Sequence, residues 1–236
     1  MNTETAEKAG TLNSGSRYGA IDAVAPNSRS NIFRNRRFGR FLGMIDDVLS
    51  QKDRCEILDV GGTTDYWRSR SSDLSGRNVH VTIVNFTGEK TSEPWMTAIA
   101  GDARDMSSLK DLSFDVVHSN SVIEHVGLWK DMCAMGSEVR RLAPRYFVQT
   151  PNYWFPVEPH FRAILIHWLP SPIRLFVMMR RRDYPGGKAS VTAAMSRLHS
   201  TILLDRKMLA AIFPDAALVP EKFFGLTKSW MAIKSK

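Results

Sequence analysis

The chain has 236 residues, of which 43% are hydrophobic, and this length allows one catalytic domain with an insertion. Its 32 basic and 24 acidic residues give a net charge of +8, which favours an anionic partner such as a phospholipid surface, a nucleic acid or a phosphorylated substrate. Cys55 and Cys133 form no C-x-x-C pair and lie in no histidine-rich cluster, which argues against a disulfide framework or a zinc site. We therefore expect a protein of the reducing cytoplasm without a metal.

The N-terminal residues 1–30 are rich in Ser, Asn, Thr, Ala and Gly and offer little that a core could bury. They contain no basic segment followed by an apolar run, so a secretory signal is not expected. We predict a disordered N-terminal segment over 1–30 and one folded domain over 31–236.

The next residues alternate between helical and strand patterns. Apolar positions at helical spacing from Phe33 to Leu49 predict a first helix. Five short apolar runs predict strands: Ile57–Val60, Val79–Val84, Thr97–Ala100, Phe114–His118 and Tyr146–Gln149. Strands separated by helical crossovers predict an α/β fold with a doubly wound, mostly parallel sheet and helices on both faces. Before the fifth strand, Leu128–Leu142 predicts a crossover helix with an inner stripe of Trp129, Met132, Met135, Val139 and Leu142.

The pattern changes after the fifth strand, because prolines interrupt the alternation until about residue 200. We assign 151–200 to a helical insertion that covers the active site as a lid. Phe161–Met179 is markedly apolar, but charged residues and prolines interrupt it, which argues against a membrane-spanning helix. Two short helices followed by Arg180-Arg-Arg182 can instead lie on an anionic membrane or cover a lipid-like acceptor.

Regular elements return at the C-terminal end. Asp205 can cap a helix that runs through Phe213. Ala217–Phe224 and Lys228–Lys234 predict two strands joined around Gly225. This antiparallel hairpin completes a sheet of seven strands.

The first strand runs into glycines in the segment Glu56-Ile-Leu-Asp-Val-Gly-Gly-Thr-Thr-Asp65. Gly61 and Gly62 allow a ligand to approach the backbone, and either following threonine can cap the next helix. Here the chain resembles the class I S-adenosylmethionine-dependent methyltransferases, whose first motif has an acidic residue at the end of strand one and then a glycine-rich turn. The resemblance implies that the turn cups the methionine part of S-adenosylmethionine and that Asp59 reaches its ammonium group, directly or through water.

Three later strand ends extend the resemblance. Asn85 ends the second strand, where the family usually has an acid that accepts hydrogen bonds from both ribose hydroxyls; an amide can accept one such bond and donate another. The third strand leads into Gly-Asp-Ala-Arg, which implies that Asp102 contacts the adenine amino group and the Ala103 backbone contacts the ring. The fourth leads into His-Ser-Asn-Ser-Val-Ile-Glu-His, which implies that Asn120 lies next to the reactive methyl group.

Two histidines are candidate general bases that take a proton from an acceptor hydroxyl: His125, in the fourth motif, and His160, in the insertion. For His125 the alternative is a structural or cofactor-adjacent role, and for His160 it is a place in a loop anchored by aromatic burial. Four residues that follow the fifth strand are predicted to contact the acceptor: Asn152, Tyr153, Trp154 and Glu158.

The resemblance implies an S-adenosylmethionine-dependent methyltransferase that acts on a small-molecule, glycan or lipid-like acceptor, with oxygen favoured over nitrogen. A nicotinamide dehydrogenase would need G-x-G-x-x-G, but the pattern started at Gly61 meets Thr63 and Tyr66. A nucleic-acid methyltransferase fits the basic charge and stays open as an alternative, although the fourth motif lacks the Asn/Asp-Pro-Pro-aromatic form, which argues against nucleic acid as the partner. A non-catalytic binding module of the same fold stays open as an alternative. We expect a cytoplasmic enzyme, with contact to an anionic membrane surface as a further alternative.

Overall fold

The computed structural model describes residues 29–88, 90–161, 163–181 and 190–236. The chain divides into two compact units, 1–43 and 44–236, which are described separately. The predicted disordered segment, 1–30, lies outside the described residues as far as residue 28, and its last two residues, Arg29 and Ser30, belong to helix α1 (Arg29–Leu49). This helix confirms the one predicted from the apolar spacing between Phe33 and Leu49.

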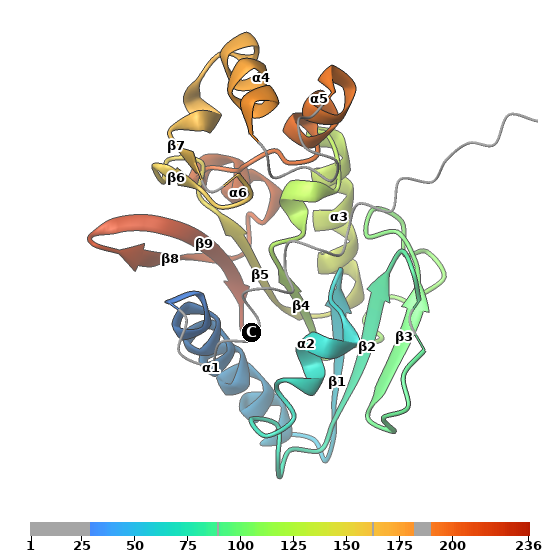
Figure 1. Cartoon of the computed structure of the whole chain (residues 1–236). Helices are drawn as coiled ribbons and strands as arrows, with labels where there is room; N and C mark the ends of the chain where they lie inside the picture. Colours follow the sequence, from blue (N-terminus) through green and yellow to red (C-terminus); the bar gives the residue numbers. More distant parts are fainter. Residues whose placement is uncertain (1–28, 89, 162, 182–189) are drawn as a thin grey trace, which may run out of the picture. The chain divides into compact units, whose positions relative to one another are not determined.

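A seven-stranded sheet organises the second unit, in the order β3-β2-β1-β4-β5-β9-β8 (Figure 1). The strands are β1 (Cys55–Val60), β2 (Val79–Asn85), β3 (Met96–Ala100), β4 (Val116–Asn120), β5 (Arg145–Pro151), β8 (Ala217–Phe223) and β9 (Leu226–Lys234). The first five are parallel, whereas β9 runs antiparallel to β5 and β8 antiparallel to β9. The predicted mostly parallel sheet with a C-terminal antiparallel hairpin is therefore confirmed.

Two details of the strand predictions are wrong. Strand β4 begins and ends two residues later than the predicted Phe114–His118, so Ser119 and Asn120 belong to the strand. The connections from β2 to β3 and from β3 to β4 contain no helix in their described residues, 86–88, 90–95 and 101–115. Turn-forming residues such as Gly88 and Pro94 stand there in place of an apolar helical stripe.

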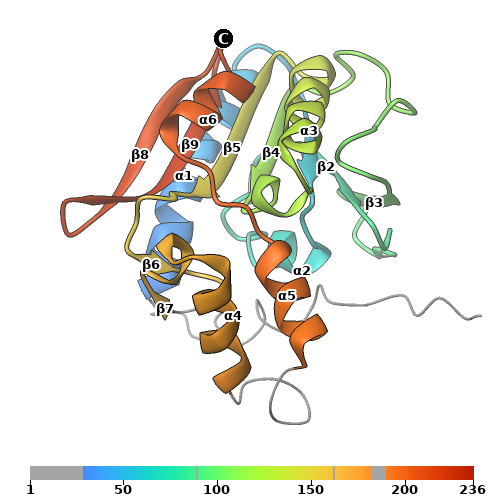
Figure 2. The ribbon, with the colours of Figure 1, turned by 90° about the horizontal axis from the view of Figure 1, so that it is seen from above.

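Helices α3 (Trp129–Leu142) and α6 (Arg206–Ile212) pack on one face of the sheet and share its main apolar core (Figure 2). The predicted inner stripe of α3 is buried except for Trp129, which stands at the first position of the helix and is 44% exposed. Asp205 caps α6 as predicted, because its carboxylate accepts a hydrogen bond from the Met208 amide at 2.9 Å. The short helix α2 (Thr64–Arg68) is capped by the hydroxyl of Thr63.

Residues 151–200 form small elements beyond the carboxyl ends of β4 and β5 (Figure 1). They comprise β6 (Val157–Glu158), β7 (Ala163–Ile164), the single turn η2 (Ile166–Trp168), α4 (Ser171–Arg180) and α5 (Val191–His199). Helices α4 and α5 pack together around a core of their own: Phe161, Ile166, Met178, Ala194 and Leu198. Within the apolar run where two short helices were predicted, the structure has the single turn η2 and one helix, α4, while α5 follows the basic run, of which Arg182 lies outside the described residues. The role of the insertion as a lid stays a prediction.

Within the described ranges, no helix has both the length and the apolar character needed to cross a membrane.

Gly136 lies where α3 meets α6, and this close approach leaves no room for a side chain. A Cβ atom on Gly136 would stand 2.2 Å from Cγ2 of Ile212, which is a stiff β-branched residue. We expect Gly136→Ala to lower the free energy of unfolding by about 1–3 kcal/mol, although alanine favours helices. Urea unfolding measures this loss.

The matched control is Gly39→Ala in α1, where a Cβ atom would meet no described atom within 4 Å. There the better helix propensity of alanine should stabilise the protein by about 0.5–1 kcal/mol. Equal effects of the two substitutions would contradict the packing argument.

Candidate functional site

The turn after β1 is built over a buried carboxylate. Asp59 is 1% exposed, and its Oδ1 lies 2.7 Å from Nδ1 of His118 while its Oδ2 accepts a hydrogen bond from Nε1 of Trp67 at 2.6 Å. A Cβ atom on Gly62 would lie 1.6 Å from Asp59 Oδ2, and Gly61 has a φ of 79°. Both glycines are therefore needed to close the turn over Asp59.

The amide of Asn85, at the end of β2, is bonded to this turn and to the loop that follows β2. Its Nδ2 donates to the carbonyl oxygen of Gly62 at 3.0 Å. Its Oδ1 accepts hydrogen bonds from the backbone amides of Thr87 and Gly88 and from the Thr87 hydroxyl. Asn85 thus joins the ends of two neighbouring strands.

The ends of β3 and β4 carry the next polar residues. Asp102 forms an ion pair with Arg104 at 2.6 Å, and the hydrogen bond from this guanidinium lowers the pKa of the carboxyl group. The neighbouring Ala103 is partly buried against the main core. Asn120, the last residue of β4, is partly buried, and no hydrogen bond joins its side-chain amide to the described residues.

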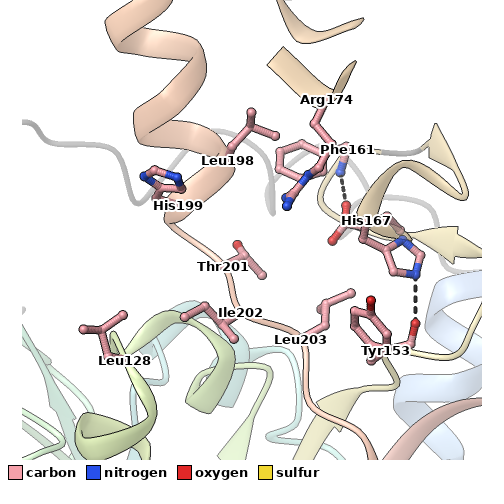
Figure 3. A pocket seen from close by; sticks show the side chains of 11 residues that line it. Leu128, Tyr153, Phe161, His167, Arg174, Leu198, His199, Thr201, Ile202 and Leu203 are labelled. Carbon is pink, nitrogen blue, oxygen red and sulfur yellow. Dashed lines mark hydrogen bonds between the residues drawn. The ribbon is translucent and has the colours of Figure 1, made fainter. Parts of the chain in front are cut away.

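A cavity of about 430 Å³ lies between the insertion, Leu128 at the start of α3 and the segment 201–203 that follows α5 (Figure 3). Its wall is largely apolar, with polar groups contributed mainly by the insertion. The lining residues are Leu128, Tyr153, Glu158, Phe161, His167, Arg174, Leu198, His199, Thr201, Ile202 and Leu203. Its size and its mixture of apolar and polar groups are typical of small-molecule sites.

Two polar atoms of the cavity wall have no hydrogen-bond partner in the described part of the chain. Nε2 of His167 lies 2.8 Å from the carbonyl oxygen of Tyr153, so Nε2 donates and the buried Nδ1 keeps its lone pair. Nε of Arg174 is also buried without a partner. Both atoms are closed off from the cavity, so a ligand can bond them only after the two side chains turn toward it.

A pair of histidines lies beside this cavity. His125 ends the single turn η1 (Ile123–His125), and its Nε2 lies 3.1 Å from Nε2 of His160. Nδ1 of His160 lies 2.7 Å from Oε1 of Glu158, and Nδ1 of His125 lies 2.9 Å from the carbonyl oxygen of Ser200. Glu158 also lines the cavity, so the pair and the cavity share a wall.

Comparison with known families agrees with this arrangement of strand ends. Residues 58–144, which include the turn after β1 and the ends of β2, β3 and β4, match the family described as "Methyltransferase domain". The match covers the strand ends that carry the resemblance to the S-adenosylmethionine-dependent methyltransferases. None of the curated proteins matches the chain.

Solved structures of methyltransferases resemble the chain only distantly. A methyltransferase from Aquifex aeolicus has 11% identity and a TM-score of 0.42, over 80% of this chain and 87% of that one. Phosphoethanolamine N-methyltransferase 2 from Haemonchus contortus has 16% identity and a TM-score of 0.47, over 77% of this chain and 39% of that one. A chain of the Haloferax volcanii complex between the Trm112 activator and a candidate methyltransferase has 18% identity and a TM-score of 0.34, over 41% of this chain and 44% of that one. The chain thus spans less than half of the last two relatives.

The residues predicted to bind the methyltransferase cofactor cluster at one edge of the sheet: Asp59, Gly61, Gly62, Asn85, Asp102, Ala103 and Asn120. The glycine turn and the unbonded amide of Asn120 fit S-adenosylmethionine at this edge. Asn85 fits only if a ribose hydroxyl takes the place of one of its present partners. Asp59 supports the glycine turn from beneath, because both of its carboxylate oxygens already bond inside the fold. Direct contact of these residues with the cofactor stays a prediction.

The predicted acceptor residues divide into two groups. Tyr153 and Glu158 line the cavity, whereas Asn152 and Trp154 do not. Asn152 is buried, and its Nδ2 donates to the carbonyl oxygen of Thr227. Trp154 is exposed and contacts the ring of Tyr153. The contacts of all four with an acceptor stay predictions.

Sequence reasoning missed two cavity residues, His167 and Arg174. Both residues interrupt the apolar run Phe161–Met179. From the sequence we took this interruption only as evidence against a membrane-spanning helix. A charged or imidazole side chain inside an apolar run also indicates a buried polar site, because such groups rarely enter a core unless they are paired.

The bonds of Asp59 predict a large effect on stability. Asp59→Ala removes the carboxylate that bonds the buried Trp67 N–H and the His118 ring nitrogen, at a cost of about 2–4 kcal/mol in the free energy of unfolding. Urea unfolding measures this loss, and Asp65→Ala is the control because the Asp65 side chain is 88% exposed. If both variants were equally stable, Asp59 would not support the turn.

Proposed function

We propose that the chain transfers a methyl group from S-adenosylmethionine to a small organic or lipid-like acceptor that binds in the cavity beside the ends of β4 and β5, with oxygen favoured over nitrogen as the nucleophile. The observation that carries this proposal is a largely apolar cavity in which two lining residues, His167 and Arg174, each have an unsatisfied polar atom beneath the wall. Buried polar groups without partners are costly, and a ligand that satisfies both removes this cost.

His167 supports a nucleophile that carries a hydrogen. Because its Nε2 donates to the Tyr153 carbonyl, its buried Nδ1 holds a lone pair, which a small movement of the ring would present to a hydroxyl or an amine of the acceptor. A hydroxyl must lose its proton as it attacks, and a neutral imidazole can take that proton. His167 therefore joins His125 and His160 as a candidate general base.

Arg174 supports an acidic group on the acceptor. Its guanidinium lines the cavity, with Nε unsatisfied, next to the ring of Phe161 (Figure 3). Guanidinium groups pair well with carboxylates and phosphates, and the apolar wall suits a hydrocarbon part. The acceptor we propose thus combines an apolar body, an acidic group and a hydroxyl.

The chain's own residues have a limited task in methyl transfer. When bound, S-adenosylmethionine supplies an already activated methyl group. The glycine turn, Asn85, Asp102 and Asn120 hold and orient the donor at the edge of the sheet, and the cavity holds the acceptor and limits the access of water. Alignment of donor and nucleophile accounts for most of the rate enhancement that we expect.

The first test separates an enzyme from a non-catalytic binding module. Calorimetry with S-adenosylmethionine and S-adenosylhomocysteine should show saturable binding to the full chain. Label from methyl-tritiated S-adenosylmethionine should then pass to members of a panel of hydroxylated fatty acids and hydroxylated aromatic acids. If neither cofactor binds, the chain is a binding module and the proposal fails.

Arg174→Met should raise KM for an acidic acceptor about 10- to 100-fold with a smaller change in kcat, because it removes a charged contact of about 1.5–3 kcal/mol. Steady-state kinetics on the acceptor found in the panel measure both constants. The control Lys207→Met removes an exposed positive charge from α6 and should change neither constant. An unchanged KM in Arg174→Met would place the acceptor elsewhere.

The outer surface of the insertion favours a second proposal, contact with an anionic membrane. Several large apolar side chains are exposed there, including Ile164 at 73% and Phe176 at 56%, and Arg180 lies 3.4 Å from the Phe176 ring centroid. Exposed apolar residues next to basic ones are typical of proteins that bind lipid surfaces.

Vesicles of phosphatidylserine and phosphatidylcholine should therefore sediment with the protein, and vesicles of phosphatidylcholine alone should not. The double variant Ile164→Ser, Phe176→Ser should lose most of this binding. Phe224→Ser, in the turn between β8 and β9, removes a ring that is even more exposed and serves as the control. Equal binding of all three proteins would contradict a contact through the insertion.

A further inference from the structure

The two histidines beside the cavity belong to a larger cluster. Glu124, His125 and His160 each offer one ligand atom, and these three atoms lie within 4.8 Å of one another. Glu124 and His125 stand in η1, directly after β4, whereas His160 belongs to the insertion. We propose that this cluster binds a divalent first-row transition-metal ion through Nε2 of His125, Nε2 of His160 and a carboxylate oxygen of Glu124.

The hydrogen bonds of the two rings determine where their protons lie. The carbonyl oxygen of Ser200 can only accept, so Nδ1 of His125 donates to it. The carboxylate of Glu158 also accepts, so Nδ1 of His160 donates to it. In neutral rings both Nε2 atoms then carry lone pairs, and they face each other at 3.1 Å. Such a contact is repulsive unless a cation lies between the two nitrogens.

The third ligand explains why that cation is a metal ion and not a shared proton. Glu124 is 1% exposed; its Oε2 accepts a hydrogen bond from the Thr150 hydroxyl, and its Oε1 is buried without a partner in the described part of the chain. A proton shared by the two rings satisfies the nitrogens but leaves this oxygen unpaired. A metal ion satisfies all three atoms.

The spacing and chemistry of the three ligands agree with this assignment. Two nitrogens 3.1 Å apart, each about 2.0–2.1 Å from a common ion, subtend an angle of about 100° at that ion, which lies between the octahedral and tetrahedral values. Imidazole nitrogen and carboxylate oxygen suit zinc, iron and related ions. His125 is exposed, which leaves the site accessible to solvent.

The surroundings of the rings match those of metal-binding histidines. The hydrogen bonds to Glu158 and to the Ser200 carbonyl hold both rings in the tautomer that presents Nε2.

The sequence predicted no metal, because the two histidines are 35 residues apart and form no recognisable spacing motif. The proposed site borders the cavity through Glu158 and Thr201, since Thr201 lines the cavity and its hydroxyl lies 3.2 Å from Nδ1 of His125. It rests on neither methyl transfer nor the identity of the acceptor.

The test uses the full chain without a histidine tag, freed of metal by a chelator. Co²⁺ titrated into this protein should give visible d–d absorption that saturates at one ion per chain, and Zn²⁺ should displace it. His125→Ala and His160→Ala should each abolish saturation. His80→Gln, in β2, is the control and should bind as the wild type does.

Two conservative variants guard against loss of folding. Glu124→Gln keeps a polar group for Thr150 but carries no charge, and it should weaken Co²⁺ binding. Glu158→Gln should lower the affinity about 10- to 100-fold, as expected when the hydrogen-bond partner of a ligating histidine is changed. Circular dichroism confirms the fold of each variant.

Absence of Co²⁺ and Zn²⁺ binding in the wild type would overturn the proposal and leave a shared proton between the rings. Stoichiometric binding that survives in both histidine variants would overturn it as well. Because the readout is absorption and not methyl transfer, its outcome is independent of the proposed function.

Discussion

The buried carboxylate of Asp59 is the interaction on which the candidate site depends. It joins β1 to β4 through His118 and to α2 through Trp67, and Gly62 closes directly above it. The His118 ring also stacks against Phe147 of β5, with centroids 5.9 Å apart. A buried carboxylate is tolerated only where it is well bonded. These contacts hold β1, β4, β5 and α2 together. These contacts also determine the position of the glycine turn after β1.

Much of the fold could be predicted from the sequence because its signals are local. The run Val79–Val84 predicted a strand because β-branched residues recur in it at every second position. The Asp205 cap and the hairpin around Gly225 follow from short-range chemistry. The error at β4 has the same origin, since Ser119 and Asn120 read as loop residues but pair with Val148 and Gln149 of β5. Pairing to a neighbouring strand overrode their own preference.

The candidate site could be predicted only in part, because its members meet through tertiary contacts. The strand-end residues were found because a parallel sheet brings its carboxyl ends together whatever lies between them. His167 and Arg174 reach the cavity through the packing of the insertion, which no local pattern encodes. The contact between His125 and His160 depends likewise on where the insertion returns to the domain. Each histidine was recognised separately, and their proximity was not.

The bridge between Asn152 and Leu204 has a consequence for the evolution of this domain. Asn152 pairs with Leu204, and the amide of Tyr153 donates to the carbonyl oxygen of Leu204, so the chain leaves the domain and re-enters it at one point. A segment whose ends are already joined can be lengthened, shortened or exchanged at little cost in loop-closure entropy. The insertion can therefore be exchanged as a unit while the sheet keeps its architecture.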